Sequence, residues 1–249
     1  MRTLLIAPAD EKRLAEALTS GAEAVVVDLA SAPSGDLAAA RSRAARFLKE
    51  ARAGTGGPRL VVGVNALDSG ETDADLDAVM GSAPDAVLLP GSFGAASVQQ
   101  LSAKLAVREA NFATSDGVTR IIAVVDAARG VLNMASYRGS SARLSGLAWS
   151  AASLSADIGV EASRDPSGAY AGALRLARDL TLLAATAAGV AAIDAAFPYL
   201  ADAEGLRAEA IAARRDGFSG KLAISPAQAR VISDVFRSRS IPLGERSPA

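Results

Sequence analysis

The chain has 249 residues, of which 50% are hydrophobic, and its formal net charge at pH 7 is −1. This length suits a single domain and is typical of a barrel of strand–helix units, and the hydrophobic share supports a large core. The chain contains no cysteine and no histidine. These absences exclude disulfides, thiolate metal sites, cysteine nucleophiles and every catalytic arrangement built on imidazole. With charges balanced and no basic stripe among aromatic residues, we expect no nucleic-acid partner.

Two apolar stretches bear on membrane targeting. The first ten residues contain too short an apolar run to act as a signal peptide, and they are better explained as a first strand. The longest weakly polar stretch, Leu180–Ile193, contains Thr and Gly, is closed by Asp194 and is too short to span a bilayer. We therefore expect a soluble, cytoplasmic protein with no membrane partner.

Apolar runs of strand length alternate along the chain with segments of helical periodicity. The expected strands are, in chain order, Thr3–Ala7, Ala24–Leu29, Arg59–Val64, Ala86–Leu89, Ile121–Val125, Leu144–Trp149, Ala191–Ala195 and Lys221–Ser225. The expected helices follow Asp10, begin at Asp36, cover Asp73–Met80, carry Val98, Leu101 and Leu105 on one face, and cover Leu174–Ala188, Asp202–Arg215 and Pro226–Arg237. Eight alternations with short connections predict an α/β fold, a single-domain TIM (β/α)8 barrel over residues 1–237. Residues 238–249 are expected to form a short, loosely ordered tail.

The fifth expected strand, Ile121–Val125, has no polar face, which is typical of a strand buried on both sides in a parallel sheet. Asp126 stands where this strand ends. Because ligands of parallel sheets and barrels bind at the carboxyl ends of the strands, an acid there is placed for chemistry. The alternative is that Asp126 caps the next helix or pairs with Arg129.

Several segments resemble the citrate lyase beta-subunit family, whose members are carbon–carbon lyases acting on acyl-CoA thioesters such as citryl-CoA and malyl-CoA and which is related to HpcH/HpaI-type aldolases. The segments that carry the resemblance are Ser20–Ala30, Asp126–Asn133, Ser153–Gly159, Ala192–Pro198 and, almost residue for residue, Glu204–Pro226. They occur in the family's order from the first strand to the eighth. The resemblance therefore implies the same barrel and a related activity.

The resemblance also implies a Mg²⁺ site, held by a glutamate at the end of strand five and an aspartate after strand six, whose charge stabilises an enolate. In this chain those positions are Asp126 and Ser153. An arginine, a lysine and a histidine of the family pattern are replaced by Gly63, Gly91 and Ser225, and two acids after Asp28 by Ala30 and Ser31.

These replacements weaken the expected metal site. Asp126 is one methylene shorter than glutamate, and a neutral serine is a poor Mg²⁺ ligand beside water. Asp157, about one helical turn after Ser153, could serve as a second ligand if its segment shifted; otherwise it is a solvated or helix-pairing acid. We expect Mg²⁺ to bind, if at all, through Asp126 and Asp157, and much more weakly than in an intact family site.

The remaining candidates lie at or just beyond strand ends. The expected catalytic residues are Asp28, Asn65, Asp126 and Arg129, and the expected substrate-binding residues are Ser150, Ser153, Asp194 and Ser225. For Asp28 and Asp194 the alternative is a structural hydrogen bond in the barrel mouth. Lys221 begins strand eight and is expected at the opposite rim, and Trp149 is expected in the core.

Two functions remain open. The first is a citrate-lyase-like carbon–carbon lyase with a modified metal site, acting on a small organic acid or an acyl-CoA. The second is a non-catalytic family member kept as a binding or assembly module. A compact carboxylate cluster at the rim would favour the enzyme, and an apolar mouth would favour the module. The alanine-rich outer helices favour a homo-oligomer formed without an exchanged carboxyl-terminal arm.

Overall fold

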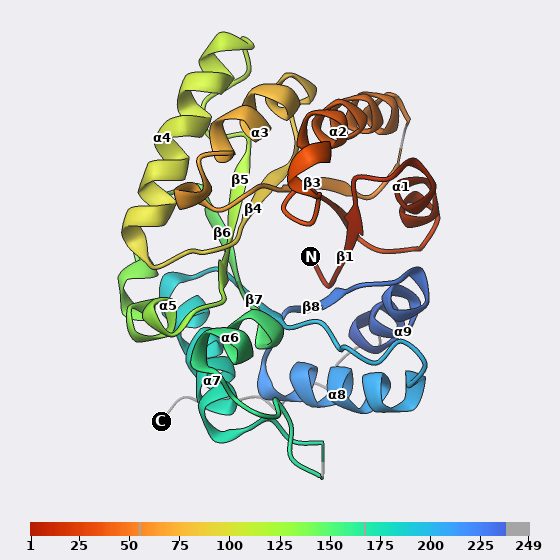
Figure 1. The fold of residues 1–249 in the computed structure, drawn as a ribbon, viewed down its shortest axis with the longest axis vertical. Helices are drawn as coiled ribbons and strands as arrows, with labels where there is room; N and C mark the ends of the chain where they lie inside the picture. Colours follow the sequence, from red (N-terminus) through yellow and green to blue (C-terminus); the bar gives the residue numbers. More distant parts are fainter. Residues whose placement is uncertain (55, 167, 238–249) are drawn as a thin grey trace, which may run out of the picture.

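The computed structural model describes residues 1–54, 56–166 and 168–237, and in them eight parallel strands close into a barrel surrounded by helices (Figure 1). The strands are β1 (Thr3–Pro8), β2 (Ala24–Asp28), β3 (Arg59–Gly63), β4 (Ala86–Leu89), β5 (Arg120–Val125), β6 (Leu144–Trp149), β7 (Ala191–Asp194) and β8 (Gly220–Ala223). Each strand pairs in parallel with the next, and β8 pairs with β1. The predicted TIM-barrel fold is confirmed, with all eight strands at the expected places.

The helices lie outside the strands, with α1 to α4 on one side of the barrel and α7 to α9 on the other (Figure 1). They are α1 (Glu11–Leu18), α2 (Leu37–Ala53), α3 (Thr72–Val79), α4 (Ala95–Asn111), α5 (Ala128–Leu132), α6 (Ala151–Ile158), α7 (Gly172–Ala188), α8 (Ala203–Asp216) and α9 (Pro226–Arg237). Short 3₁₀ turns η1 (Ser34–Asp36), η2 (Leu67–Ser69), η3 (Met80–Ser82) and η4 (Met134–Tyr137) complete the connections.

The apolar residues of the strands form two cores on opposite faces of the barrel wall. Along β2, Val26 belongs to the cluster inside the barrel, whereas Val25 and Val27 belong to the larger cluster between strands and helices. Successive side chains of a strand point to opposite faces. A strand of this barrel is therefore apolar on both faces, which explains why its sequence is an unbroken hydrophobic run.

Lys221, expected at the rim opposite the strand exits, has neighbours of both kinds. It pairs in register with Thr3, the first residue of β1, on one side and with Asp194, the last residue of β7, on the other. Strands of a closed barrel are staggered, so an early residue of one strand can lie beside the end of its neighbour. The expected burial of Trp149 is confirmed, since its exposed fraction is 0%.

Residues 238–249, the expected tail, lie outside the described residues. In the part of the chain that the structure describes, no helix is both long enough and apolar enough to cross a membrane.

Candidate active site at the barrel mouth

A cavity of about 390 Å³ opens at the carboxyl ends of the strands. Its lining is largely apolar, and two aspartates and two serines supply its polar side chains. The lining residues are Ile6, Asp28, Ala30, Gly63, Val64, Leu88, Pro90, Val124, Asp126, Trp149, Ser150, Ala151, Ala152, Ser153, Ala196, Pro198, Leu222 and Ile224. The structure thus gathers four of the predicted site residues around one cavity.

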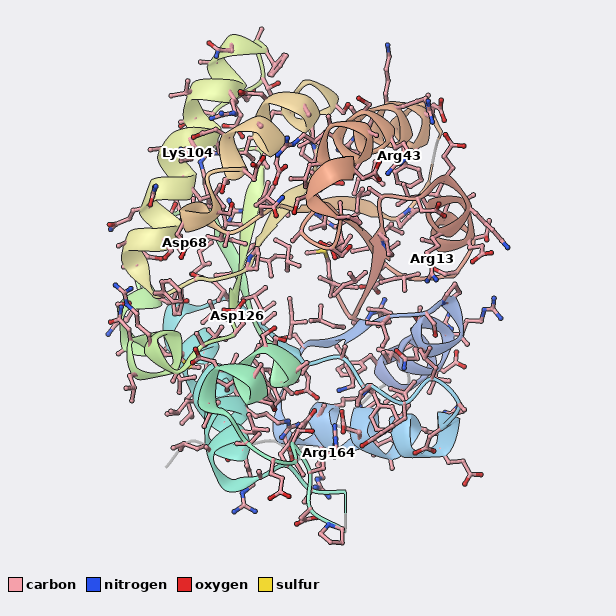
Figure 2. The ribbon with its side chains drawn as sticks, viewed as in Figure 1. Arg13, Arg43, Asp68, Lys104, Asp126 and Arg164 are labelled. Carbon is pink, nitrogen blue, oxygen red and sulfur yellow. The ribbon has the colours of Figure 1, made fainter. Side chains whose placement is uncertain are left out.

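Asp126 follows the last residue of β5 and lies toward the middle of the molecule, whereas Arg13, Arg43 and Lys104 lie on outer helices (Figure 2). One of its carboxylate oxygens accepts a hydrogen bond from the Gly91 backbone N–H at 2.8 Å. Burial raises the pKa of Asp126, backbone hydrogen bonds from Gly91 and from Asp126 itself act against this rise, and the nearby charges of Asp157 and Asp68 add to it. Such a carboxyl group holds its proton more readily than an exposed aspartate does.

Asp28 is the last residue of β2, and its Oδ1 accepts the Ala30 backbone N–H at 3.0 Å. Burial raises the pKa of Asp28, although hydrogen bonds from Ser31 and Ala30, which favour the charged form, act against this rise. Gly63 leaves the space beside it open, because a Cβ at position 63 would lie 3.1 Å from Asp28 Oδ1. The mouth therefore holds two carboxyl groups whose pKa values are both raised by burial.

The first turn of α6 forms one side of the cavity. Ser150 is its N-cap residue, and the Ser150 hydroxyl accepts the Ser153 N–H at 3.2 Å and contacts the Ser153 hydroxyl at 2.9 Å. The N–H groups of a first helical turn have no carbonyl partner within the helix and carry the positive end of its dipole. Ala151 and Ala152, which line the cavity, are the first two residues of this helix. This side of the mouth therefore suits an oxygen atom that gains negative charge during a reaction.

Five predicted residues do not line the cavity, and three of them make contacts at its edge or outside it. Asn65 donates through its backbone N–H and its Nδ2 to one oxygen of Asp75, at 2.7 and 2.9 Å. The Arg129 guanidinium stacks over the Phe93 ring, 4.9 Å from its centroid. Ser225 accepts the Gln228 N–H at 3.2 Å, which caps the start of α9. Each of these contacts is structural.

Asp194 lies on the other side of the barrel wall. Its carboxylate is fully buried and accepts from Lys221 Nζ at 2.8 Å, Trp149 Nε1 at 2.9 Å and Arg178 Nε at 3.1 Å. Desolvation acts to raise the pKa of Asp194, but Lys221 and Arg178 outweigh it, and the net shift is downward. The structure does not bring this residue to the cavity with Asp28 and Asp126.

The sequence analysis missed the apolar lining. Ile6, Leu88, Val124 and Leu222 line the cavity from β1, β4, β5 and β8. The signal was available in the alternation of side chains along a strand, since these residues share a face with the inner core. The same alternation places Asp28, Asp126 and Ser150 inward, and Asp194 and Ser225 outward.

The residues at this mouth do not fit the implied Mg²⁺ site. Asp126 accepts the Gly91 N–H, and Ser153 bonds to Ser150. Asp157 accepts the Ala128 N–H at 2.7 Å and so fixes the start of α5. In the described ranges, no three His, Cys, Asp or Glu side chains are grouped so that they could hold a metal ion.

Comparisons with known proteins agree with this barrel. The family model HpcH/HpaI aldolase/citrate lyase matches residues 2–226. Citrate lyase subunit beta of Leuconostoc mesenteroides subsp. cremoris is 31% identical over 239 residues, covering 94% of this chain and 76% of the relative. A (3S)-malyl-CoA thioesterase of Cereibacter sphaeroides is 31% identical over 238 residues, with the same coverage.

Solved structures show the same fold. The citrate lyase beta subunit of Mycobacterium tuberculosis, complexed with oxaloacetate and magnesium, has a TM-score of 0.80 and 31% identity and covers 94% of this chain and 96% of that chain. A complex of the Mycobacterium tuberculosis protein CitE with magnesium, acetoacetate and coenzyme A has a TM-score of 0.80 and 31% identity, covering 96% of this chain and 81% of that chain. The chain therefore belongs to the HpcH/HpaI aldolase/citrate lyase family.

Proposed function

We propose that this protein is a carbon–carbon lyase that cleaves a 3-hydroxyacyl thioester by a retro-aldol reaction, with Asp28 and Asp126 acting as base and acid. The observation that carries the proposal is the pair of aspartates, both with a raised pKa, in one largely apolar cavity at the carboxyl rim. A group that gives or takes a proton works best when its pKa lies near the working pH. Burial moves both carboxyl groups in that direction.

The two aspartates have different surroundings, and this difference assigns their roles. Both carboxyl groups accept hydrogen bonds that favour the charged form. Only Asp126 also has neighbouring acids, Asp157 and Asp68, whose charges disfavour its ionisation, so Asp126 suits the acid and Asp28 the base. A negative charge that develops on a neighbouring oxygen raises the pKa of Asp126 further, so that the carboxyl group takes up a proton and donates a hydrogen bond to that oxygen.

In the proposed reaction, the Asp28 carboxylate takes the proton of the substrate's 3-hydroxyl group. The bond between C2 and C3 breaks, C3 leaves as the carbonyl carbon of an aldehyde or ketone, and the electron pair moves into the thioester enolate. Asp126 and the first turn of α6 stabilise the enolate oxygen. Asp28 then returns the proton that it took to C2, which gives the shortened acyl thioester and restores the Asp28 carboxylate. No step uses a metal, because the residues present do not fit one.

The thioester in this proposal is supported by the relatives, among which are a malyl-CoA thioesterase and a structure that contains coenzyme A. Of the two expected partners, an acyl-CoA is therefore the one that the proposal retains.

A second candidate is a binding module without catalysis. The largely apolar lining of the mouth, and the poor fit of the expected metal ligands among the described residues, favour it.

The test uses the N-acetylcysteamine thioester of 3-hydroxybutyrate, an uncharged surrogate whose cleavage releases acetaldehyde. A lyase releases acetaldehyde and acetyl thioester in equal amounts, and both Asp28→Asn and Asp126→Asn slow this release by roughly 10²-fold or more. Asp179→Asn, which changes an exposed acid on α7, is the matched control and keeps the activity. Saturable binding without aldehyde assigns the binding module, and release of free thiol instead of aldehyde assigns a thioesterase.

A further inference from the structure

The mouth cavity offers no cation to a bound carboxylate. Among the described residues that line it there is neither lysine nor arginine. Lys221 of strand β8 lies on the outer face of the barrel. Its Nζ donates hydrogen bonds there to Asp194 and Glu209, at 2.8 and 2.7 Å. The Arg129 guanidinium stacks on Phe93.

The charges that do surround the cavity are negative. Asp28 and Asp126 line it, and Asp157 and Asp68 lie close enough to raise the pKa of Asp126. An entering carboxylate would lose its hydration without gaining an ion pair, and it would meet charges of its own sign. An uncharged group meets neither cost.

Gly63 offers a position at which a cation can be introduced into the cavity. Its missing side chain would project beside Asp28, since its Cβ position lies 3.1 Å from Asp28 Oδ1. The backbone of Gly63 is outside the left-handed region, so other residues can adopt it. A longer side chain at position 63 would enter the mouth and bring its charge there.

We infer that the mouth selects an acyl group that carries no carboxylate. This class differs from oxaloacetate, pyruvate and acetoacetate, the anions found with magnesium in the solved relatives. The thioester and the hydroxyl of the substrate rest on the proposed function, whereas the charge preference rests on the cavity alone.

The test compares the binding of two acyl thioesters of N-acetylcysteamine by calorimetry at pH 7.5. The butyryl thioester ends in a methyl group, and the succinyl thioester ends in a carboxylate. Neither has a 3-hydroxyl group, so neither undergoes the proposed cleavage. We expect the butyryl thioester to bind at least about tenfold more tightly. Equal or tighter binding of the succinyl thioester overturns the inference.

Gly63→Arg tests where the preference arises. It places a cation beside Asp28 and is expected to reverse the preference in favour of the succinyl thioester. Gly35→Arg is the matched control, because the Cβ position of Gly35 faces open space and adds the same charge away from the mouth. An unchanged preference in folded Gly63→Arg contradicts the inference.

Asp126→Asn keeps the test decisive if Gly63→Arg does not fold. Removing this negative charge must improve the binding of the succinyl thioester relative to the butyryl thioester, and an unchanged ratio overturns the inference. Failure of the proposed lyase is seen separately. If 3-hydroxybutyryl thioester is not cleaved but the charge preference holds, the proposed function is wrong and the inference about the cavity stands.

Discussion

The catalytic role proposed for Asp126 brings a cost in stability. Burial raises its folded pKa above the ordinary value of 3.8. The stability that it contributes is therefore fully present below the unfolded pKa and is lost as the pH rises through the folded pKa. At neutral pH the protein holds a charge in a place that disfavours it.

Asp126→Asn is accordingly expected to lower turnover roughly 10²- to 10⁴-fold, the usual contribution of one acid–base group. The same change is expected to raise the melting temperature at pH 7, and the difference from wild type should vanish near pH 3. Thermal unfolding across this pH range, with a turnover assay, measures both effects. A variant that is less stable than wild type at pH 7 would show that the charge of Asp126 is compensated.

Asp194 has the opposite pH dependence. Its folded pKa is lowered, so its stabilising contribution is present above the unfolded value of 3.8 and is lost as the pH falls through the folded pKa. Asp194→Asn leaves the buried Lys221 and Arg178 without one of their acids. Breaking a buried pair in this way costs about 3 to 5 kcal/mol.

Urea unfolding at pH 7 measures this loss of stability. Asp179→Asn, which changes an exposed side chain of α7, is the control and is expected to change the free energy of unfolding little. A loss of less than about 1 kcal/mol, the usual contribution of a surface pair, would mean that solvent reaches the Asp194 cluster.

At the scale of elements, α5 is held between the barrel mouth and the loop before α4. A Cβ at Gly130 of α5 would lie 2.8 Å from the Ser92 backbone oxygen, closer than real Cβ atoms come. Asp157 holds the start of the same helix through the Ala128 N–H. The position of α5, and of Asp126 just before it, therefore depends on glycine at position 130.

Gly130→Ala is expected to displace α5 and reduce turnover while the barrel stays folded. Gly172→Ala is the matched control, because α7 begins there and the added Cβ faces open space. Replacing glycine by alanine in a helix otherwise stabilises it by about 1 kcal/mol, so the control should not lose stability. Circular dichroism and the turnover assay report the two properties; full activity in Gly130→Ala would show that the contact relaxes freely.

At the scale of the whole molecule, the fold could be predicted because burial on both faces leaves a clear pattern. Runs such as Ala24–Leu29 and Ile121–Val125 have no polar face, and each is followed by a helical segment. The family resemblance supplied the order of the strands independently. Eight strands closing into one barrel satisfied both patterns.

The candidate site was predicted only in part, because a position at the end of a strand indicates the rim, and the face is known only once the alternation along that strand is counted from its inner residues. Asp28 and Asp126 point into the barrel, whereas Asp194 points to the helices, where Lys221 meets it. The register of β8 against β7, which brings Lys221 beside Asp194, cannot be deduced from the sequence of either strand. The cavity depends on Gly63 as well, whose contribution is an absent side chain.

The expected homo-oligomer is a prediction for the assembled protein. Leu132, Leu176 and Leu183 are 89%, 57% and 64% exposed, although large apolar side chains are usually buried. Leu176 and Leu183 lie two turns apart on one face of α7. Light scattering at several concentrations should give a mass above that of one chain. A mass near 25.1 kDa throughout would mean a monomer.

Deleting residues 238–249 tests the second part of this prediction, the absence of an exchanged arm. The assembly is expected to survive the deletion, and its dissociation would show that these residues hold the copies together.

Two half-buried carboxyl groups, those of Asp28 and Asp126, are proposed to cleave the carbon–carbon bond without a metal. The most direct measurement is the rate of acetaldehyde release from 3-hydroxybutyryl-N-acetylcysteamine in excess EDTA and again with millimolar Mg²⁺. The account predicts the same rate in both, lost in Asp28→Asn and in Asp126→Asn. A reaction that EDTA abolishes and Mg²⁺ restores would contradict it.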